Sequence, residues 1–433
     1  MKYVNKLTQK NCWYLTVVLF LYIYAPFLNV SGIPIHLPYI YDLVFVLIFV
    51  YIITYNTVIT SYINLLGLYT VGYVWILLIS AVNGVLDTNM QLVYINGFST
   101  ILSSYAIAHL YFEKYKEEAA QYIIYGVFVS GVVHAIIMAL AFFSDPFRTV
   151  LYSFVALSET GASFYRRGIR SPGLTSSGSD GLSVFQASTM VFGIVYLFTT
   201  NRKKTEIGRM LIYGTTFIVL LLSLFLSART GLVVLIFGIV LFIIYKVFIP
   251  KIAIRKKTIQ KVWLLTCLCA FLVPMLIHLI MNSPYHRMAY RAFELYYNYT
   301  ETGDVYTTST NSLKEMFFLP ENKNHLLFGD GNFGRDSNLP YIRSDVGYVR
   351  SIYGAGIIGT VFMYMWILYI MIMALKYWQT SPRLAFLLVF LVLTILLFNI
   401  KVFHFAAKRE TFKVLFILFT VLLLQTKFRF RGN

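Results

Sequence analysis

The chain has 433 residues, of which 58% are hydrophobic and 12% charged, and its formal net charge is +18. A soluble globular chain is roughly 45–50% apolar and about 25% charged. This composition excludes an ordinary soluble domain. Since the apolar residues come in blocks of roughly 18 or more, long enough to cross a hydrocarbon core as helix, we expect an all-α polytopic integral membrane protein with a single transmembrane domain over residues 1–433.

The positive charge does not indicate a nucleic-acid partner, because the Lys and Arg residues are mostly dispersed among the loops between apolar blocks. The positive-inside rule accounts for most of them. The three cysteines, Cys12, Cys267 and Cys269, lie in or at the edge of apolar segments. We expect buried small side chains there, with neither a disulfide framework nor a metal site.

Twelve apolar segments are candidate membrane-spanning helices. The first resembles a signal peptide, but it is too long for an h-region and no A-x-A-like site follows it, so we interpret it as a spanning helix. The segments are 12–30, 38–59, 61–82, 91–112, 120–143, 181–199, 208–226, 230–249, 262–281, 349–375, 383–400 and 411–426. The boundaries at 59–61 and 227–230 have the fewest polar residues.

The distribution of cations predicts the topology. With both termini cytoplasmic, the inner segments contain clusters such as 202–209 and 246–261, whereas the outer loops 31–37 and 83–90 contain no Lys or Arg. This contrast follows the positive-inside rule and supports the placement of both termini inside.

Three outer loops break the rule, namely 144–180, 282–348 and 401–410, the last with Lys401, Lys408 and Arg409. Long loops cross regardless of charge, which covers the first two. For the third, either the last two spans are miscounted or the cations serve a purpose outside, and we favour the second explanation.

The outer loop 144–180 ends in a polar stretch, RSPGLTSSGSDG, in which ten residues separate Arg170 from Gly181. Composition alone favours a flexible surface loop. The alternative is an anion site, because glycine lets backbone N–H groups approach a ligand and a helix N-terminus favours an anion. Ser179 or Asp180 is then the expected cap of the helix that starts near Gly181, and Asp180 is a candidate partner of Arg170.

Two further arginines lie at predicted outer edges. Arg229 stands in SARTG between two apolar segments, and Arg343 is followed, again after ten residues, by Gly354. The guanidinium fork fits phosphate oxygens, so Arg170, Arg229 and Arg343 are candidates to converge on one pyrophosphate. The alternatives are a turn anchor for Arg229 and chance spacing for the Arg–Gly pairs.

Other motifs are less specific. The stretch 286–299 fits either an interfacial amphipathic helix or a packed loop helix. GDGNFG at 329–334 resembles a fragment of a phosphate loop but lacks the following Lys-Ser/Thr, which favours a Gly-rich turn. The chain has no GxxxxGK[ST], DxD or HExxH motif, so we expect no metal or other cofactor.

Together, the run of spans, the two long outer loops, the paired Arg-x10-Gly stretches, SARTG, GDGNFG, SDVGYV and GAGIIG resemble the Wzy-type O-antigen and capsule polymerases. These are relatives of the O-antigen ligases with a GT-C-type membrane architecture. The architectural similarity covers nearly the whole chain, and the motif similarity covers about 165–185, 225–235 and 325–360.

The resemblance implies transfer of a glycan from undecaprenyl pyrophosphate to a second lipid-linked repeat unit on the periplasmic side, without nucleotide or metal. The partners it implies are a lipid-linked donor and acceptor, membrane lipid and a chain-length regulator protein, with no nucleic acid. It assigns pyrophosphate binding to Arg170, Arg229 and Arg343. Beside these we nominate Asp345, together with Arg343, for catalysis, and Gly181 and Gly354 for loop support.

The identity of the base is open. Asp345 is the nearest carboxylate in RSDVGY, where the related ligases have a histidine. It is equally suited to capping the following helix. His286, His325 and His404 also lie in predicted outer loops, where each is more simply an exposed loop residue, so an O-antigen ligase remains an alternative. A lipid-linked oligosaccharide flippase is a further alternative, disfavoured because no internal repeat is visible.

Overall fold

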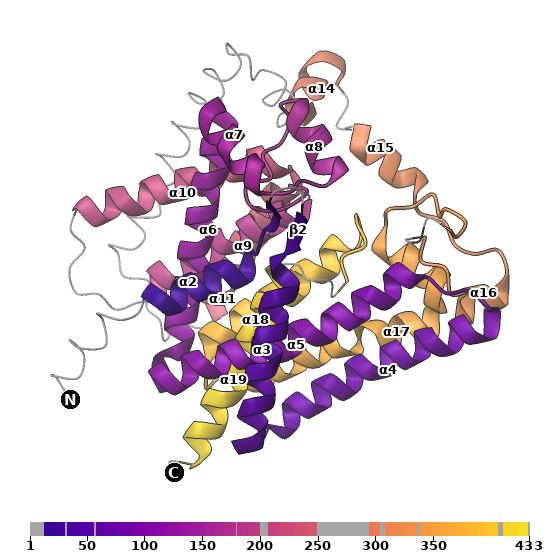
Figure 1. The fold of residues 1–433 in the computed structure, drawn as a ribbon, viewed down its shortest axis with the longest axis horizontal. Coiled ribbons are helices and arrows are strands. Elements are labelled where there is room, and N and C mark those ends of the chain that lie inside the picture. Colours follow the sequence, from indigo (N-terminus) through magenta and orange to yellow (C-terminus); the bar gives the residue numbers. More distant parts are fainter. Residues whose placement is uncertain are drawn as a thin grey trace. The chain divides into compact units, whose positions relative to one another are not determined.

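Figure 1 shows the computed structural model of the chain, which describes residues 13–30, 33–55, 58–178, 180–199, 207–248, 294–303, 308–334, 336, 338–405 and 410–431. This part of the chain is mainly helical. It contains seven continuous helical stretches that are long and apolar enough to cross a membrane and three shorter apolar helices. The chain divides into two compact units. Unit 1 comprises residues 1–41 and 121–301, and unit 2 comprises residues 42–120 and 302–433.

Eleven of the twelve predicted segments coincide with helices. They are α2 (Trp13–Ile23), α3 (Leu37–Tyr55), α4 (Thr60–Asn83), α5 (Thr88–Tyr115), α6 (Ala119–Phe143), α9 (Asp180–Thr199), α10 (Ile207–Ser227), α11 (Thr230–Phe248), α17 (Gly347–Lys376), α18 (Pro382–Phe398) and α19 (Glu410–Arg431). The two boundaries with the fewest polar residues, at 59–61 and 227–230, both separate distinct helices. The segment 262–281 lies outside the described residues, so the count of twelve spans stays a prediction.

The predicted first helix, 12–30, is wrong in its last third. Helix α2 ends at Ile23, and the chain then forms strand β1 (Phe27–Val30), which pairs antiparallel with β2 (Ile33–His36). Pro26 explains the early end, since proline has no N–H to donate within a helix and disfavours helical backbone in the residue before it. This hairpin is the one departure from an all-α fold within the described ranges.

Unit 1 is built around α9, which packs against α10 and α11. Its interior position explains why α9 is less apolar than α11. The buried polar residues of α9 are hydrogen-bonded, as with Ser188 Oγ, which donates to Val184 O at 2.9 Å. Unit 1 also contains three smaller helices, namely α7 (Asp145–Phe154), α8 (Glu159–Arg166) and α14 (Glu294–Thr302). The predicted loop 144–180 is therefore partly helical.

Unit 2 pairs α4 with α17 and α5 with α19, and α18 packs between α17 and α19. Helix α19 is its most deeply buried helix, and large aromatic side chains such as Trp366 fill the core. Two short helices, α15 (Thr308–Glu315) and α16 (Lys323–Phe328), precede the polar loop that leads into α17.

Helix α17 is broken at Gly356, whose backbone has φ 69° and ψ 179°. The break frees the preceding carbonyls, and unit 2 supplies a donor to each of three. Tyr353 O accepts from Asp330 N at 2.9 Å, and Gly354 O accepts from Gly331 N at 3.0 Å. Ala355 O accepts from Trp75 Nε1 at 2.9 Å. The GDGNFG loop is thereby fixed to the first segment of α17.

Candidate functional site

Arg170 and Arg229 each pair with a carboxylate in unit 1. Arg170 Nη2 lies 3.3 Å from Asp180 Oδ1, and its guanidinium stacks over the Phe164 ring at 4.4 Å. Arg229 Nη1 donates to Glu294 Oε2 at 2.7 Å. Asp180, the candidate partner of Arg170, is confirmed in that role and is also the first residue of α9, so the helix begins where predicted.

The two arginines lie in the same part of unit 1. Ser171 N, next to Arg170, donates to Leu226 O at 2.8 Å. Gly231 N, two residues after Arg229, donates to Ser183 Oγ at 2.7 Å, and Ser183 Oγ donates to Ala228 O. The first turns of α9 and α11 are therefore joined. Two arginines and two helix N-termini, each of which favours an anion, meet at one end of this bundle.

The loop 170–178 is packed, and the expectation of a flexible surface loop is wrong. Ser171 Oγ donates to Met138 O at 2.8 Å, and Leu174 N donates to His134 Nε2 at 3.2 Å. Pro172, Gly173 and Gly178 are buried, and both glycines have positive φ. These glycines are needed for the turn itself, since L side chains rarely adopt that backbone conformation. Ser179 lies outside the described residues.

His134 is a residue that the sequence analysis missed. Its ring is fully buried in α6, stacks on Tyr24 at 4.0 Å between centroids, and places Nδ1 2.9 Å from the Gln186 amide. Leu174 N of the loop and Gln186 of α9 therefore contact the two nitrogens of the same ring. A single histidine within an apolar segment was the one sign of this role in the sequence. Its loop partner, Leu174, is 40 residues away, so the sequence did not indicate the contact.

Arg343 belongs to unit 2, so the convergence of all three arginines stays a prediction. Its side chain is exposed on the loop before α17. Gly181 is buried in the first turn of α9. Gly354 is buried in α17, where an added Cβ would lie 2.6 Å from the Phe333 ring. Gly354 therefore supports the GDGNFG loop by close packing.

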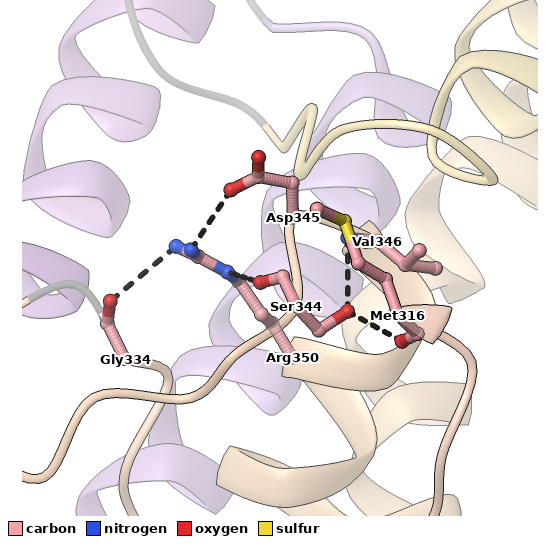
Figure 2. Close-up of polar contacts among 6 residues, drawn as sticks. All are labelled: Met316, Gly334, Ser344, Asp345, Val346 and Arg350. Atoms are coloured by element: carbon pink, nitrogen blue, oxygen red, sulfur yellow. Dashed lines mark hydrogen bonds and ion pairs between the residues drawn. The ribbon is translucent and has the colours of Figure 1, made fainter. Parts of the chain in front are cut away.

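Asp345 is held by Arg350, a second residue that the sequence analysis missed (Figure 2). Arg350 Nη2 lies 3.2 Å from Asp345 Oδ1, Nε donates to Ser344 O at 2.5 Å, and Nη1 donates to Gly334 O at 3.4 Å. Capping of α17 by Asp345 is wrong, because Val346 is the cap residue and no side chain bonds there. The structure instead gives Asp345 a bracing contact, with its carboxyl group exposed.

Ser344 extends this brace. Its hydroxyl donates to Met316 O at 2.8 Å and accepts from Val346 N at 3.2 Å (Figure 2). Arg350 lies one turn inside α17, so the spacing RSDVGYVR was the available signal. An arginine in a first helical turn can fold back over the loop that precedes it. The exposed Arg343 is thus carried on a loop with fixed backbone.

GDGNFG is a Gly-rich turn, as expected. Asp330 Oδ1 accepts from Asn332 N at 2.8 Å, and Asn332 Oδ1 accepts from Gly334 N at 2.7 Å. Phe333 N donates to Asp87 Oδ2 at 3.2 Å, and Asp87 also caps α5. The loop amides at 331–334 are therefore occupied by protein acceptors and do not line a phosphate cradle. Burial raises the pKa of the Asp330 carboxyl above its usual range.

Asp336 fixes the same loop to α5. Its Oδ2 accepts from Thr88 Oγ1 at 2.5 Å and from Thr88 N at 3.2 Å, and its Oδ1 accepts from Asn338 N at 2.9 Å. These hydrogen bonds lower the pKa of the Asp336 carboxyl below its usual value, and the bond from Thr88 Oγ1 has the largest effect. Because its pKa is lower in the folded protein, the ionised Asp336 carboxylate stabilises the fold at pH values above its unfolded-state pKa of about 3.9. This stabilisation is lost as the pH falls through the folded-state pKa.

We therefore expect Asp336→Asn to lower the midpoint of thermal denaturation at neutral pH. The difference from wild type should shrink as the pH falls below about 4. Denaturation of the detergent-solubilised protein between pH 7 and pH 3.5 measures this. Glu315→Gln, which changes an exposed carboxylate of α15, is the control. A difference for Asp336→Asn that persists unchanged at pH 3.5 contradicts the assignment.

The three histidines considered as bases differ in position. His404 is fully buried between the rings of Phe398 and Phe412, so its expected exposure is wrong. Asn399 Oδ1 accepts from His404 N at 3.0 Å. His325 is half-buried in the last turn of α16. His286, together with Arg335, Lys408, Arg409, the three cysteines and most of 286–299, lies outside the described residues.

No family model matches the chain, and no curated protein matches it.

Proposed function

We propose that this protein is a membrane glycosyltransferase that polymerises lipid-linked oligosaccharide repeat units. The observation that supports this most directly is the pair of arginines beside the joined first turns of α9 and α11 in unit 1. Arg170 and Arg229 each form an ion pair with a carboxylate there. In a body of long apolar helices, such a site suits an anionic group attached to a lipid.

The proposed chemistry needs that anion site. The bond between sugar C1 and the pyrophosphate oxygen of undecaprenyl pyrophosphate breaks, and the hydroxyl oxygen of the acceptor sugar bonds to C1 and loses its proton to a base. Preorganised cations stabilise the charge that builds on the leaving pyrophosphate, and one such group contributes about 3–4 kcal/mol. Asp180 and Glu294 hold the arginines in place before the substrate binds.

Arg343 and Asp345 of unit 2 are the further candidate residues, Arg343 for the pyrophosphate and Asp345 for the acceptor hydroxyl. Arg343 is the exposed cation of the braced loop before α17, and Asp345 is the exposed carboxylate beside it. Asp345 serves as base or positions the acceptor hydroxyl. The reaction takes place on the periplasmic side of the bacterial inner membrane, with both termini cytoplasmic, and a chain-length regulator is the expected protein partner.

The proposal predicts a defined product pattern in cells. A strain lacking this protein, complemented with Arg170→Ala or Arg343→Ala, should lose the ladder of long surface glycan but keep the product with one repeat unit. Arg166→Ala and Lys323→Ala, at exposed cations of the two outer loops, are the matched controls and should restore the ladder. Gel electrophoresis of surface glycan and immunoblots of the membrane fraction give the readout.

Two outcomes count against polymerisation. If the single-repeat product also disappears while lipid-linked precursor accumulates, ligation or export is the better assignment. If all four variants restore the ladder at equal protein levels, the arginines have no role in the reaction.

A further inference from the structure

Helix α7 has an apolar face that the protein covers only in part. It follows α6 after a single residue, Ser144, and begins at Asp145 (Figure 1). At 3.6 residues per turn its apolar and polar residues separate onto two faces. The apolar face contains Pro146, Phe147, Val150, Leu151 and Phe154, and the polar face contains Asp145, Arg148, Thr149, Tyr152 and Ser153.

Contacts with the rest of unit 1 fix the rotation of α7. Tyr152 packs edge-on against Tyr165 of α8 at 5.1 Å. The Arg148 guanidinium lies 5.3 Å from the same ring and pairs with Asp145. Phe147 and Leu151 are half-buried. The described part of the protein does not cover the rest of the apolar face, where Val150 is 61% and Phe154 59% exposed.

The β1–β2 hairpin extends this surface. Val155, at the end of α7, forms a bridge with Leu28, and Ala156 N donates to Phe27 O at 2.7 Å. Two residues beyond Leu28, the hairpin exposes Val30 and then Ile33, at 45% and 66%. An exposed apolar patch of this kind marks a site of interaction with protein or membrane.

We infer that α7 and the β1–β2 hairpin form a platform that lies in the interface of the surrounding lipid bilayer. The chain connectivity selects lipid as the partner. The hairpin joins α2 to α3 with no gap before Leu37, and α7 follows α6 directly, so the patch stays at the level where apolar helices end. The exposed Arg166 and Arg167 of the adjoining segment suit lipid phosphates, as on other interfacial helices.

Site-directed fluorescence in the full-length protein tests this placement. In a background with Cys12, Cys267 and Cys269 changed to serine, a single cysteine replaces Val150 or Phe154 and carries an environment-sensitive fluorophore. Thr149→Cys, exposed on the polar face of the same helix, is the matched control. The labelled proteins are reconstituted into nanodiscs with lipids that bear a doxyl quencher at acyl carbon 5 or 12.

If the apolar face of α7 lies about 5–10 Å deep in the membrane, the three labels should differ in how strongly each quencher acts on them. Doxyl lipid should quench the labels at 150 and 154 at least two-fold more than the label at 149, and the shallow quencher should act more strongly than the deep one. Aqueous iodide should show the opposite order of positions. The patch faces water, and the inference fails, if iodide quenches all three labels equally. It also fails if both quenchers leave 150 and 154 unaffected, which indicates cover by protein such as a second copy.

Discussion

Arg229→Ala is expected to lower the turnover of purified, reconstituted protein by about two to three orders of magnitude. Removal of one preorganised donor to a developing anion costs a catalyst about that much. The loss should fall on kcat more than on KM, because the charge on the leaving pyrophosphate is larger in the transition state than in the bound substrate. A lipid-linked repeat unit as substrate, with product length followed by gel or mass spectrometry, gives both constants.

The ion pair with Glu294 allows a structural role to be separated from a catalytic one. If Arg229 only anchors α14 to the start of α11, Glu294→Ala breaks the same contact and should cause the same loss. If Arg229 binds pyrophosphate, Glu294→Ala keeps the guanidinium, and kcat should stay within a few-fold of wild type. Equal losses in the two single variants and no further loss in the double variant contradict the catalytic assignment.

Gly356→Ala is expected to destabilise unit 2 by about 3 kcal/mol or more. The conformation with φ 69° and ψ 179° is almost restricted to glycine and costs other residues about 1–3 kcal/mol. An added Cβ would also meet the backbone of Leu327 and Phe328 at the end of α16, and overpacking of this kind costs about 1–3 kcal/mol. If α17 straightens instead, Tyr353, Gly354 and Ala355 lose their present donors.

Gly67→Ala is the matched control for this substitution. Gly67 is also a helical glycine of unit 2, but an added Cβ there meets no atom within 4 Å, and alanine favours helix by about 1 kcal/mol. The midpoint of thermal denaturation in detergent should fall by roughly 5–10 °C for Gly356→Ala and stay level or rise for Gly67→Ala. Similar behaviour of the two variants means that the break in α17 is not required.

The positions of the helices were predictable because hydrophobicity is a local property. Apolar runs such as 61–82 and 411–426 match α4 and α19 to within a few residues except at the C-terminal end of α19. The start of α9 at Asp180 was also readable, since a polar, glycine-rich stretch gives way there to an apolar one. The first segment failed where one proline outweighed the hydrophobic pattern.

The candidate site was only partly predictable. Arg170, Arg229, Arg343 and Asp345 were recognised as charges near apolar sequence, but their contacts depend on distant residues. Glu294, the partner of Arg229, is 65 residues away. Arg350 braces the loop through the backbone carbonyls of Ser344 and Gly334, which are ten residues apart in the sequence. Packing likewise decides that His404 is buried, although the sequence places it in a short polar connection.

The sequence by itself determined which segments are helical and where cations collect, because each follows from composition over one stretch of chain. The tertiary structure decided how polar groups are satisfied. The carbonyls freed at Gly356 find donors in Asp330, Gly331 and Trp75, and the loop after Arg170 is held by His134 of α6. A polar group away from water must find a partner, and only the packed fold shows which residue provides it.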